Sequence, residues 1–217
     1  MVAPKPWKPG PAPTWPGYSA ALRDDPEGVA AVLDASGDFF LDRTDLAWAI
    51  ELESGWDPAA INKKSKAAGL IQMMPETQDA MKVTHVEKAN RTQQAPVIRD
   101  FFTRNGLHAA NKAGNRVAGD ALLAIFAPAG IGKPDSYVLF PVGSPGWKAN
   151  PSYRPKDDGP ITAGSVRRVG TPRAMRPRPP APPKGPPPKP GVEGSGGGGV
   201  LLAILLVGGL VLLDDAG

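Results

Sequence analysis

The sequence predicts a mainly α-helical domain flanked by segments that cannot form a packed core. Three observations support this fold class. Between residues 21 and 170, apolar residues recur at helical spacing, and long alternating runs typical of strands are absent. Sixteen of the 27 prolines lie instead in residues 1–20 and 171–199. At 217 residues the chain is long enough for one domain with extensions.

Proline and charge divide the chain into four parts. Residues 1–20 hold six prolines and no acid, which predicts an extended arm; the prolines also interrupt any secretory signal helix. Residues 21–170 carry 18 basic and 18 acidic side chains, so the net charge of +4 comes from elsewhere. Residues 171–199 hold ten prolines and end in a Gly-rich run, which predicts a disordered spacer. This basic spacer lacks aromatic residues for base stacking, so no specific nucleic-acid partner is expected.

The fourth part is the hydrophobic segment Val200–Leu213, which has no polar side chain. As a helix it would span about 21 Å, less than the roughly 30 Å of a bilayer core. We interpret it as a short or partly inserted transmembrane helix. Burial in an assembly of other proteins, or a cleaved tail, remain alternatives.

Composition restricts the available chemistry to carboxylates, hydroxyls and amides. The chain has no cysteine and only two histidines, which excludes disulfides, Cys-ligated zinc and thiol nucleophiles and disfavours a His-dependent triad. Asp157, Asp158 and Gly159 resemble a fragment of a calcium loop but offer too few ligands, so a turn is expected there and no metal site.

Helices are expected over 27–34, from an N-cap at Asp42 to Gly55, and over 75–82, 96–103 and 120–126; residues 137–140 are a candidate strand. In the second helix Asp45 follows the N-cap by three residues, as in a capping box. Its apolar face contains Leu46, Ala49 and Ile50, and Glu53 lies on that same face. Glu51 lies opposite and is expected to face water.

The residues after this helix form a specific motif. Glu53 begins Glu-Ser-Gly-Trp-Asp-Pro-Ala-Ala, and residues 67–77 read Ala-Ala-Gly-Leu-Ile-Gln-Met-Met-Pro-Glu-Thr. The pair resembles the soluble lytic transglycosylase signature E-S-G-[FW]-[DN]-P-x-A followed by A-x-G-L-[MI]-Q-x-M-P-x-T. The resemblance, which extends to the goose-type lysozyme-like fold, is strong over residues 50–80 and weaker to about 170.

The resemblance implies a mechanism with one carboxylate and no cofactor. Glu53 would be the catalytic acid and base, with a pKa raised by its apolar neighbours. Asp57, a tempting second carboxylate, would form a turn before Pro58. Substrate-binding roles are implied for the following residues: Ser54, Ser65, Gly69, Leu70, Gln72, Met73 and Phe126. Lys63, Lys64 and Lys66 form a basic loop that could touch peptide carboxylates but is more simply explained as solvated.

One departure concerns the third family motif, A-Y-N-A-G. The corresponding stretch is Ala124-Ile125-Phe126-Ala127-Pro128-Ala129-Gly130, so Phe126 takes the place of the tyrosine without its hydroxyl. This variant looks more like bacteriophage virion-borne members than cell-wall housekeeping enzymes. It also leaves the choice between transglycosylation and hydrolysis open.

The expected function is a peptidoglycan lytic transglycosylase (a lyase-type glycosidase) that cleaves the MurNAc–GlcNAc β-1,4 bond to 1,6-anhydro ends. We expect it to be carried in a phage virion with other virion proteins, associated with a virion or host membrane through Val200–Leu213, and to open the cell wall locally during genome entry. The alternative is a structural virion or membrane protein whose lysozyme-like domain binds glycan with little or no cleavage.

Overall fold

The computed structural model describes residues 15–39, 42–107 and 117–172, and these are mainly α-helical, as predicted. Two short strands, β1 (Val138–Phe140) and β2 (Ile161–Thr162), pair antiparallel. The helices are α1 (Pro16–Asp24), α2 (Pro26–Asp38), α3 (Arg43–Ser54), α4 (Pro75–Met81), α5 (Arg91–Arg104), α7 (Asp120–Phe126), α8 (Pro145–Ala149) and α9 (Ala163–Gly170), with 3₁₀ turns η1 (Val86–Lys88), η2 (Pro128–Gly130) and η3 (Pro151–Tyr153).

The predicted spacer and the segment Val200–Leu213 lie outside the described residues, apart from Thr171 and Pro172, as do residues 1–14 of the predicted arm. Among the residues that are described, no helix has the length and apolar character needed to cross a membrane.

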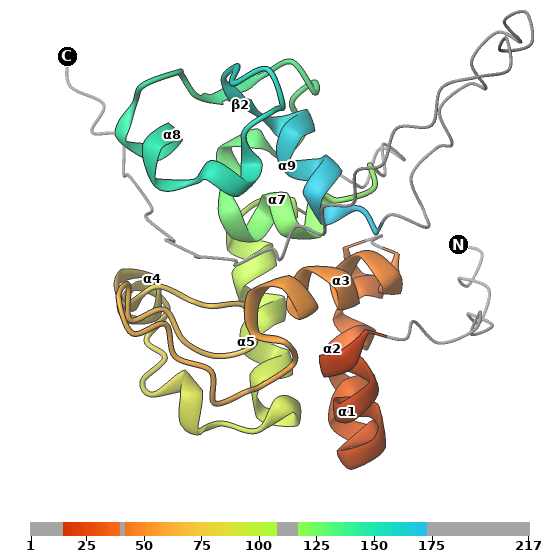
Figure 1. The fold of residues 1–217 in the computed structure, drawn as a ribbon. Coiled ribbons are helices and arrows are strands. Elements are labelled where there is room, and N and C mark those ends of the chain that lie inside the picture. Colours follow the sequence, from red (N-terminus) through yellow and green to blue (C-terminus); the bar gives the residue numbers. More distant parts are fainter. Residues whose placement is uncertain (1–14, 40–41, 108–116, 173–217) are drawn as a thin grey trace, which may run out of the picture.

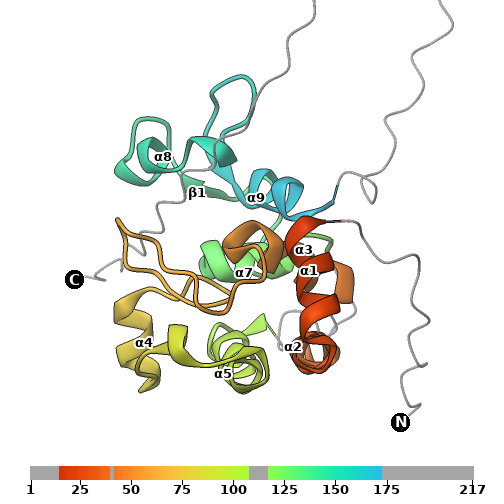
Figure 2. The ribbon, with the colours of Figure 1, turned by 60° about the horizontal axis from the view of Figure 1, so that its bottom comes forward.

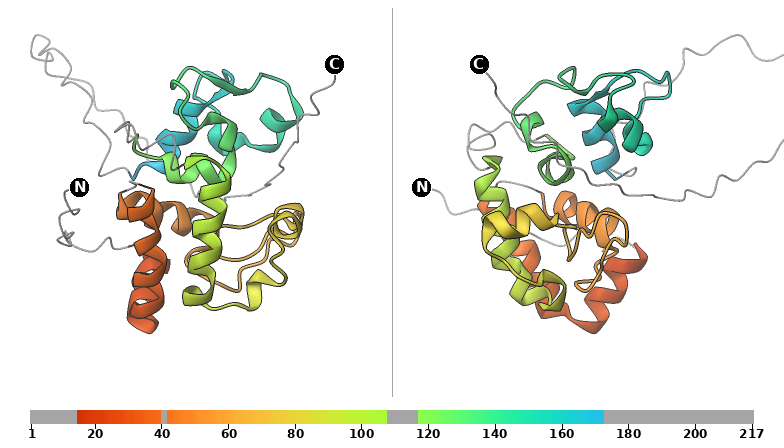
Figure 3. Two further views of the ribbon diagram at one scale, coloured as in Figure 1. Left: turned by 180° about the vertical axis from the view of Figure 1, so that it is seen from behind. Right: turned by 90° about the vertical axis from the view of Figure 1, so that its left-hand side faces the viewer.

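The chain is arranged in two halves that meet at α3 and α7 (Figures 1 and 2). Helices α1 to α5 form one half, in which α2 and α5 pack closely against each other. The strands with α8 and α9 form the other half, on the far side of α7, and the view from behind shows the same division (Figure 3). Helix α3 contacts α7 and α9 as well as α1 and α2, so it is shared by both halves.

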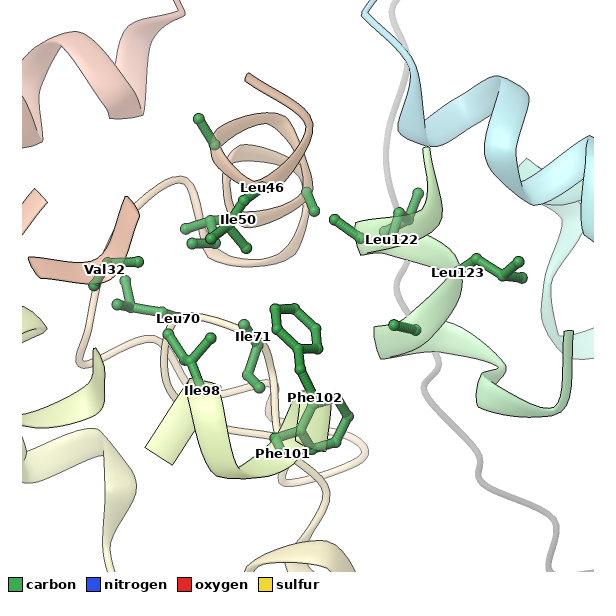
Figure 4. Packing of buried hydrophobic residues seen from close by; sticks show 14 of the residues in the cluster. Val32, Leu46, Ile50, Leu70, Ile71, Ile98, Phe101, Phe102, Leu122 and Leu123 are labelled. Carbon is green, nitrogen blue, oxygen red and sulfur yellow. The ribbon is translucent and has the colours of Figure 1, made fainter. Parts of the chain in front are cut away.

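The hydrophobic core surrounds the apolar face of α3. Leu46 and Ile50 of α3 are fully buried and face Leu70 of the loop that follows α3 (Figure 4). Ile98 of α5 and Leu122 of α7 complete the surroundings of this face. The predicted buried face of α3 is therefore correct.

The expected arm ends earlier than residue 20, because α1 begins at Pro16. Proline at the first helical position is compatible with a helix start, since its missing N–H needs no partner there. Aromatic burial then fixes the segment: the Tyr18 ring packs at 5.4 Å from Trp56, and the Trp15 ring at 4.8 Å from Trp48. The expectation of an extended chain over 15–20 was wrong.

Glu51 does not face water as expected. Its two carboxylate oxygens accept hydrogen bonds from the backbone N–H groups of Gly17 at 3.1 Å and Tyr18 at 2.8 Å. These are unpaired groups of the first turn of α1, where a negative charge is favourable. A Cβ on Gly17 would lie 2.2 Å from the Gly55 carbonyl oxygen, so only glycine allows this close approach.

Asp42 caps α3 as predicted, accepting a hydrogen bond from the Thr44 N–H at 2.7 Å. Asp45 does not complete a capping box. It is buried, and its Oδ2 accepts a hydrogen bond from the Gly119 N–H at 2.9 Å, which ties α3 to the start of α7. Burial raises the pKa of Asp45 to about 7.

A buried ion pair holds α7 against α9. Arg167 Nε lies 2.7 Å from Asp120 Oδ1, with both side chains almost completely buried. Its Nη1 lies 2.7 Å from Asp135 and donates to the Lys133 carbonyl at 3.0 Å. Because the guanidinium has several partners, its burial does not leave the charge uncompensated. This network fixes the helix that carries Phe126.

Helix α5 begins five residues before the predicted start at Pro96. Asn90 and Gln93 form a capping box, in which each side chain accepts a hydrogen bond from the other residue's backbone N–H. Pro96 lies inside the helix rather than at its first position. The Asn-x-x-Gln pattern was the better start signal.

Gln94, which the earlier start places in α5, holds the loop between α3 and α4. Its side chain is buried, and its Oε1 accepts a hydrogen bond from the Leu70 N–H at 2.8 Å. Its Nε2 donates to the carbonyl groups of Pro58, Val86 and Ala89 at 2.8–3.0 Å. One side chain thus contacts four backbone groups from three segments, with its two Nε2 N–H groups shared among three carbonyl oxygens.

We expect Gln94→Met to lower the free energy of unfolding by about 3 kcal/mol or more, because at nearly constant volume it removes hydrogen bonds to four backbone groups, two of them buried and two part-buried. The matched Gln93→Met change, which removes only a surface capping contact, should cost about 1 kcal/mol. Urea unfolding measures both. Equal losses for the two variants would contradict the role given to Gln94.

Candidate active site

A cavity of about 300 Å³ lies between the end of α3, the loop after it, α4 and the end of α5 on one side, and α7 with Asn150 on the other. Its walls therefore come from both halves of the molecule, which meet at α3 and α7 (Figure 1). Glu53, the last residue but one of α3, lies in this wall.

The loop from Gly55 to Met74 is folded by its own hydrogen bonds. Gly55 ends α3 in the left-handed conformation, and the buried Trp56 donates from Nε1 to the Ala47 carbonyl at 3.2 Å. Asp57 accepts a hydrogen bond from the Ala59 N–H, the turn role that the family resemblance implies. Ala68 forms antiparallel bridges with both Ile61 and Met73, so the loop doubles back beside Glu53.

Glu53 is the electrostatically distinctive group of the cavity. Burial raises the pKa of its carboxyl to about 8, and no hydrogen bond from another described residue stabilises the ionised form. Part of the residue remains accessible from the cavity. At neutral pH Glu53 is therefore a protonated acid that a ligand can reach, which is the state required of a general acid.

Four of the predicted substrate-binding residues line the same cavity as Glu53: Ser65, Gln72, Met73 and Phe126. Gln72 has φ of +47°, and its Nε2 donates to the Gly69 and Ala60 carbonyl groups at 3.0 and 3.3 Å. The amide is thus oriented by the loop, and its carbonyl oxygen is the end left for a ligand. Ser65 Oγ accepts a hydrogen bond from the Ala67 N–H at 3.3 Å.

Three other predicted substrate-binding residues do not line the cavity. Leu70 is completely buried in the core. Gly69 has φ of +77° and packs so closely that a Cβ would lie 2.7 Å from Gln94 Oε1. Ser54 Oγ donates back to the Ile50 carbonyl at 3.3 Å. Gly69 and Leu70 shape the loop that presents Gln72, and Ser54 belongs to the last turn of α3, which explains why they occur in the motif without touching the cavity.

Phe126 lies in the cavity wall, and a tyrosine from another segment packs on it. The Tyr153 ring of η3 is centred 4.1 Å from the Phe126 ring. Tyr153 is buried, and its pKa is raised by that burial and by the negative charge of Glu53. The structure therefore places a tyrosine against the cavity residue Phe126 that sequence reasoning missed, since residues 151–153 carry no motif.

Several further cavity residues were also missed. Asn62 and Asn150 add amide groups, and Arg104 with Asn105 adds polar groups at the end of α5. Their positions depend on tertiary contacts, and only Asn62, inside the motif loop, could have been found from the sequence. Lys63, Lys64 and Lys66 are exposed and do not line this cavity.

Acidic and histidine side chains do not cluster in the described ranges: no group of three or more there could hold a metal ion. The Asp157 carboxylate accepts a long hydrogen bond, 3.4 Å, from the Gly159 N–H, which forms a local turn.

Residues 35–98 match the family model of the transglycosylase SLT domain. This stretch includes Glu53, Gln72 and Gln94, and it confirms the predicted resemblance to lytic transglycosylases. The match supports an enzyme that acts on the glycosidic bonds of peptidoglycan. Phe126, Asn150 and Tyr153 lie outside the matched stretch. No curated protein and no solved structure gave a significant match to the chain.

The raised pKa of Glu53 predicts a pH-dependent cost to stability. The folded protein keeps a proton on Glu53 up to about pH 8, whereas the unfolded chain loses it near 4.5. Stability is therefore lost as the pH rises through this window. We expect Glu53→Gln to match the wild type near pH 4 and to be more stable by about 1–3 kcal/mol near pH 8.5.

Urea unfolding at the two pH values measures this difference. A Glu53→Gln variant with the same relative stability at both pH values would contradict the proposed burial of the charge. Glu51→Gln is the matched control: it should lose stability, because one N–H of α1 then lacks its carboxylate acceptor.

Proposed function

We propose that the protein is a peptidoglycan lytic transglycosylase that cleaves the β-1,4 bond between N-acetylmuramic acid and N-acetylglucosamine, with Glu53 as its single acid and base. The observation that carries this proposal is Glu53 in the wall of the cavity that Gln72 also lines, with a carboxyl pKa that burial raises to about 8. Glu76 also lines the cavity, but it is exposed in the first turn of α4.

The reaction needs one protein carboxyl group, that of Glu53, together with groups of the substrate itself. Glu53 donates its proton to the glycosidic oxygen as the bond to C1 breaks, and the substrate's acetamido group stabilises the positive charge that develops. The ionised Glu53 then takes the proton of the 6-hydroxyl while O6 bonds to C1. This closes the 1,6-anhydro ring and restores the protonated acid.

Tyr153 supports the ionised state of Glu53 in this proposal. Its raised pKa keeps the phenol protonated, so it can donate a hydrogen bond when Glu53 has lost its proton. Phe126, which replaces the tyrosine of the family motif, holds the Tyr153 ring by direct packing. The hydroxyl that the third motif lacks would then come from η3.

We further propose that the enzyme acts from a phage virion, where it opens the host cell wall locally during genome entry. The Pro-rich spacer would set the reach of the domain, and Val200–Leu213 would anchor it to a virion or host membrane. This part of the proposal rests on the composition of the sequence and on the altered third motif.

The test is mass analysis of muropeptides released from purified peptidoglycan by the full chain, with Glu53→Gln beside it. We expect products lighter by one water than hydrolysed muropeptides, and none from the variant. Ordinary reducing ends would mean lysozyme-like hydrolysis. A folded protein that binds peptidoglycan but releases nothing would favour the glycan-binding alternative.

For Tyr153→Phe we expect kcat to fall by about ten- to a hundredfold, the effect of losing one hydrogen bond to a charged group. The basic limb of the pH–rate profile should move to higher pH, because the ionised Glu53 loses a donor. Tyr137→Phe, at an exposed tyrosine, is the control and should change neither. An unchanged pH–rate profile in Tyr153→Phe would contradict the proposed hydrogen bond from Tyr153 to the ionised Glu53.

A further inference from the structure

We infer that the part of the cavity between α4 and the end of α5 binds the acidic peptide substituent of the glycan, with Arg104 as the partner of a peptide carboxylate. This inference rests on the proposed function and deepens it. In peptidoglycan, every second sugar carries a lactyl ether that is extended by a short peptide of small apolar and acidic residues.

The cavity continues beyond the groups that the sugar chemistry requires. On the side of α4 and α5 the cavity is lined by Thr77, Ala80 and Met81 of α4 and Phe101 of α5, with the exposed Glu76 at the start of α4. Met81 and Phe101 are largely buried, so the small part of each side chain that remains accessible forms an apolar surface of the cavity. Sugar hydroxyls gain little from such a wall, whereas the methyl groups of a short alanine-containing peptide bury apolar surface against it.

Arg104 is the cation in this wall. Of the cavity-lining residues in the described part of the chain, it alone carries a positive charge. Its contact with Asp100 is long, 3.9 Å, with the two side chains 56% and 66% exposed. Such a solvated pair contributes little, so the guanidinium can exchange this partner for a ligand carboxylate.

The geometry of α5 places Arg104 on the same side of the helix as the apolar surface formed by Phe101. Phe101 and Arg104 are three residues apart and therefore lie on the same helix face. Arg104 is the last residue of α5, and the planar guanidinium suits bidentate binding of a carboxylate. Arg99 offers a matched contrast, because it pairs at 2.7 Å with Asp38 of α2 and does not line the cavity.

The experiment compares two substrates cleaved by the full chain: short glycan strands that carry their peptides, and the same strands after the peptides have been removed. We expect Arg104→Ala to lower kcat/KM on the peptide-bearing strands about tenfold, mainly through KM, as for one charge-assisted hydrogen bond. On peptide-free strands the change should stay below about twofold. Arg104→Lys should recover part of the loss, and Arg99→Ala should leave the ratio between the substrates unchanged.

Equal losses on both substrates would overturn the inference and make Arg104 a structural residue of the helix end. A shift of the ratio in Arg99→Ala as large as that in Arg104→Ala would overturn it too, since it would indicate a general charge effect. If the folded wild type cleaves neither substrate, the proposed function fails. Calorimetric Kd values for the two strands then decide the inference: a tenfold preference for peptide-bearing strands that Arg104→Ala abolishes supports it, and no such preference overturns it.

Discussion

The hydrogen bonds of Gln94 are the constraint on which the candidate site depends. Four backbone groups converge on this one buried amide: the Leu70 N–H and the carbonyl groups of Pro58, Val86 and Ala89. The loop between α3 and α4 has little regular secondary structure, so its buried polar groups need partners from elsewhere. Gln94 supplies them, and so places the turn that carries Gln72 beside Glu53. The matched family stretch, 35–98, extends just far enough to include this amide.

The two halves are joined by polar groups as well as by apolar packing. The Asp45 carboxylate of α3 accepts a hydrogen bond from the Gly119 N–H, and the Arg167 guanidinium of α9 forms an ion pair with Asp120 of α7. Because these groups are buried, breaking either contact would leave an uncompensated polar atom, which makes the relative position of α3 and α7 well defined. That position determines where Phe126 and Tyr153 lie with respect to Glu53.

Local patterns predicted the elements whose cause is local. The apolar face of α3, the N-cap at Asp42 and the whole of α7 follow from periodicity and end signals. The predictions that were wrong concern side chains whose hydrogen-bond partners lie far away in the sequence. Glu51 was expected to face water and Asp45 to complete a local cap, whereas Glu51 accepts hydrogen bonds from two N–H groups of α1 and Asp45 accepts one from the N–H of Gly119, the N-cap of α7. The motif identified the loop correctly but could not separate Gln72, which lines the cavity, from Leu70, which is core.

The origin of the cavity walls in both halves of the chain has a mechanical consequence. Burial raises the pKa of Glu53, and the wall of the cavity that it lines includes Phe126 and Asn150 as well as the loop after α3. Any separation of the halves would admit water to the carboxyl and return its pKa toward that of an ordinary glutamate. The raised pKa of Glu53 is thus a property of the whole domain and depends on side chains from both halves.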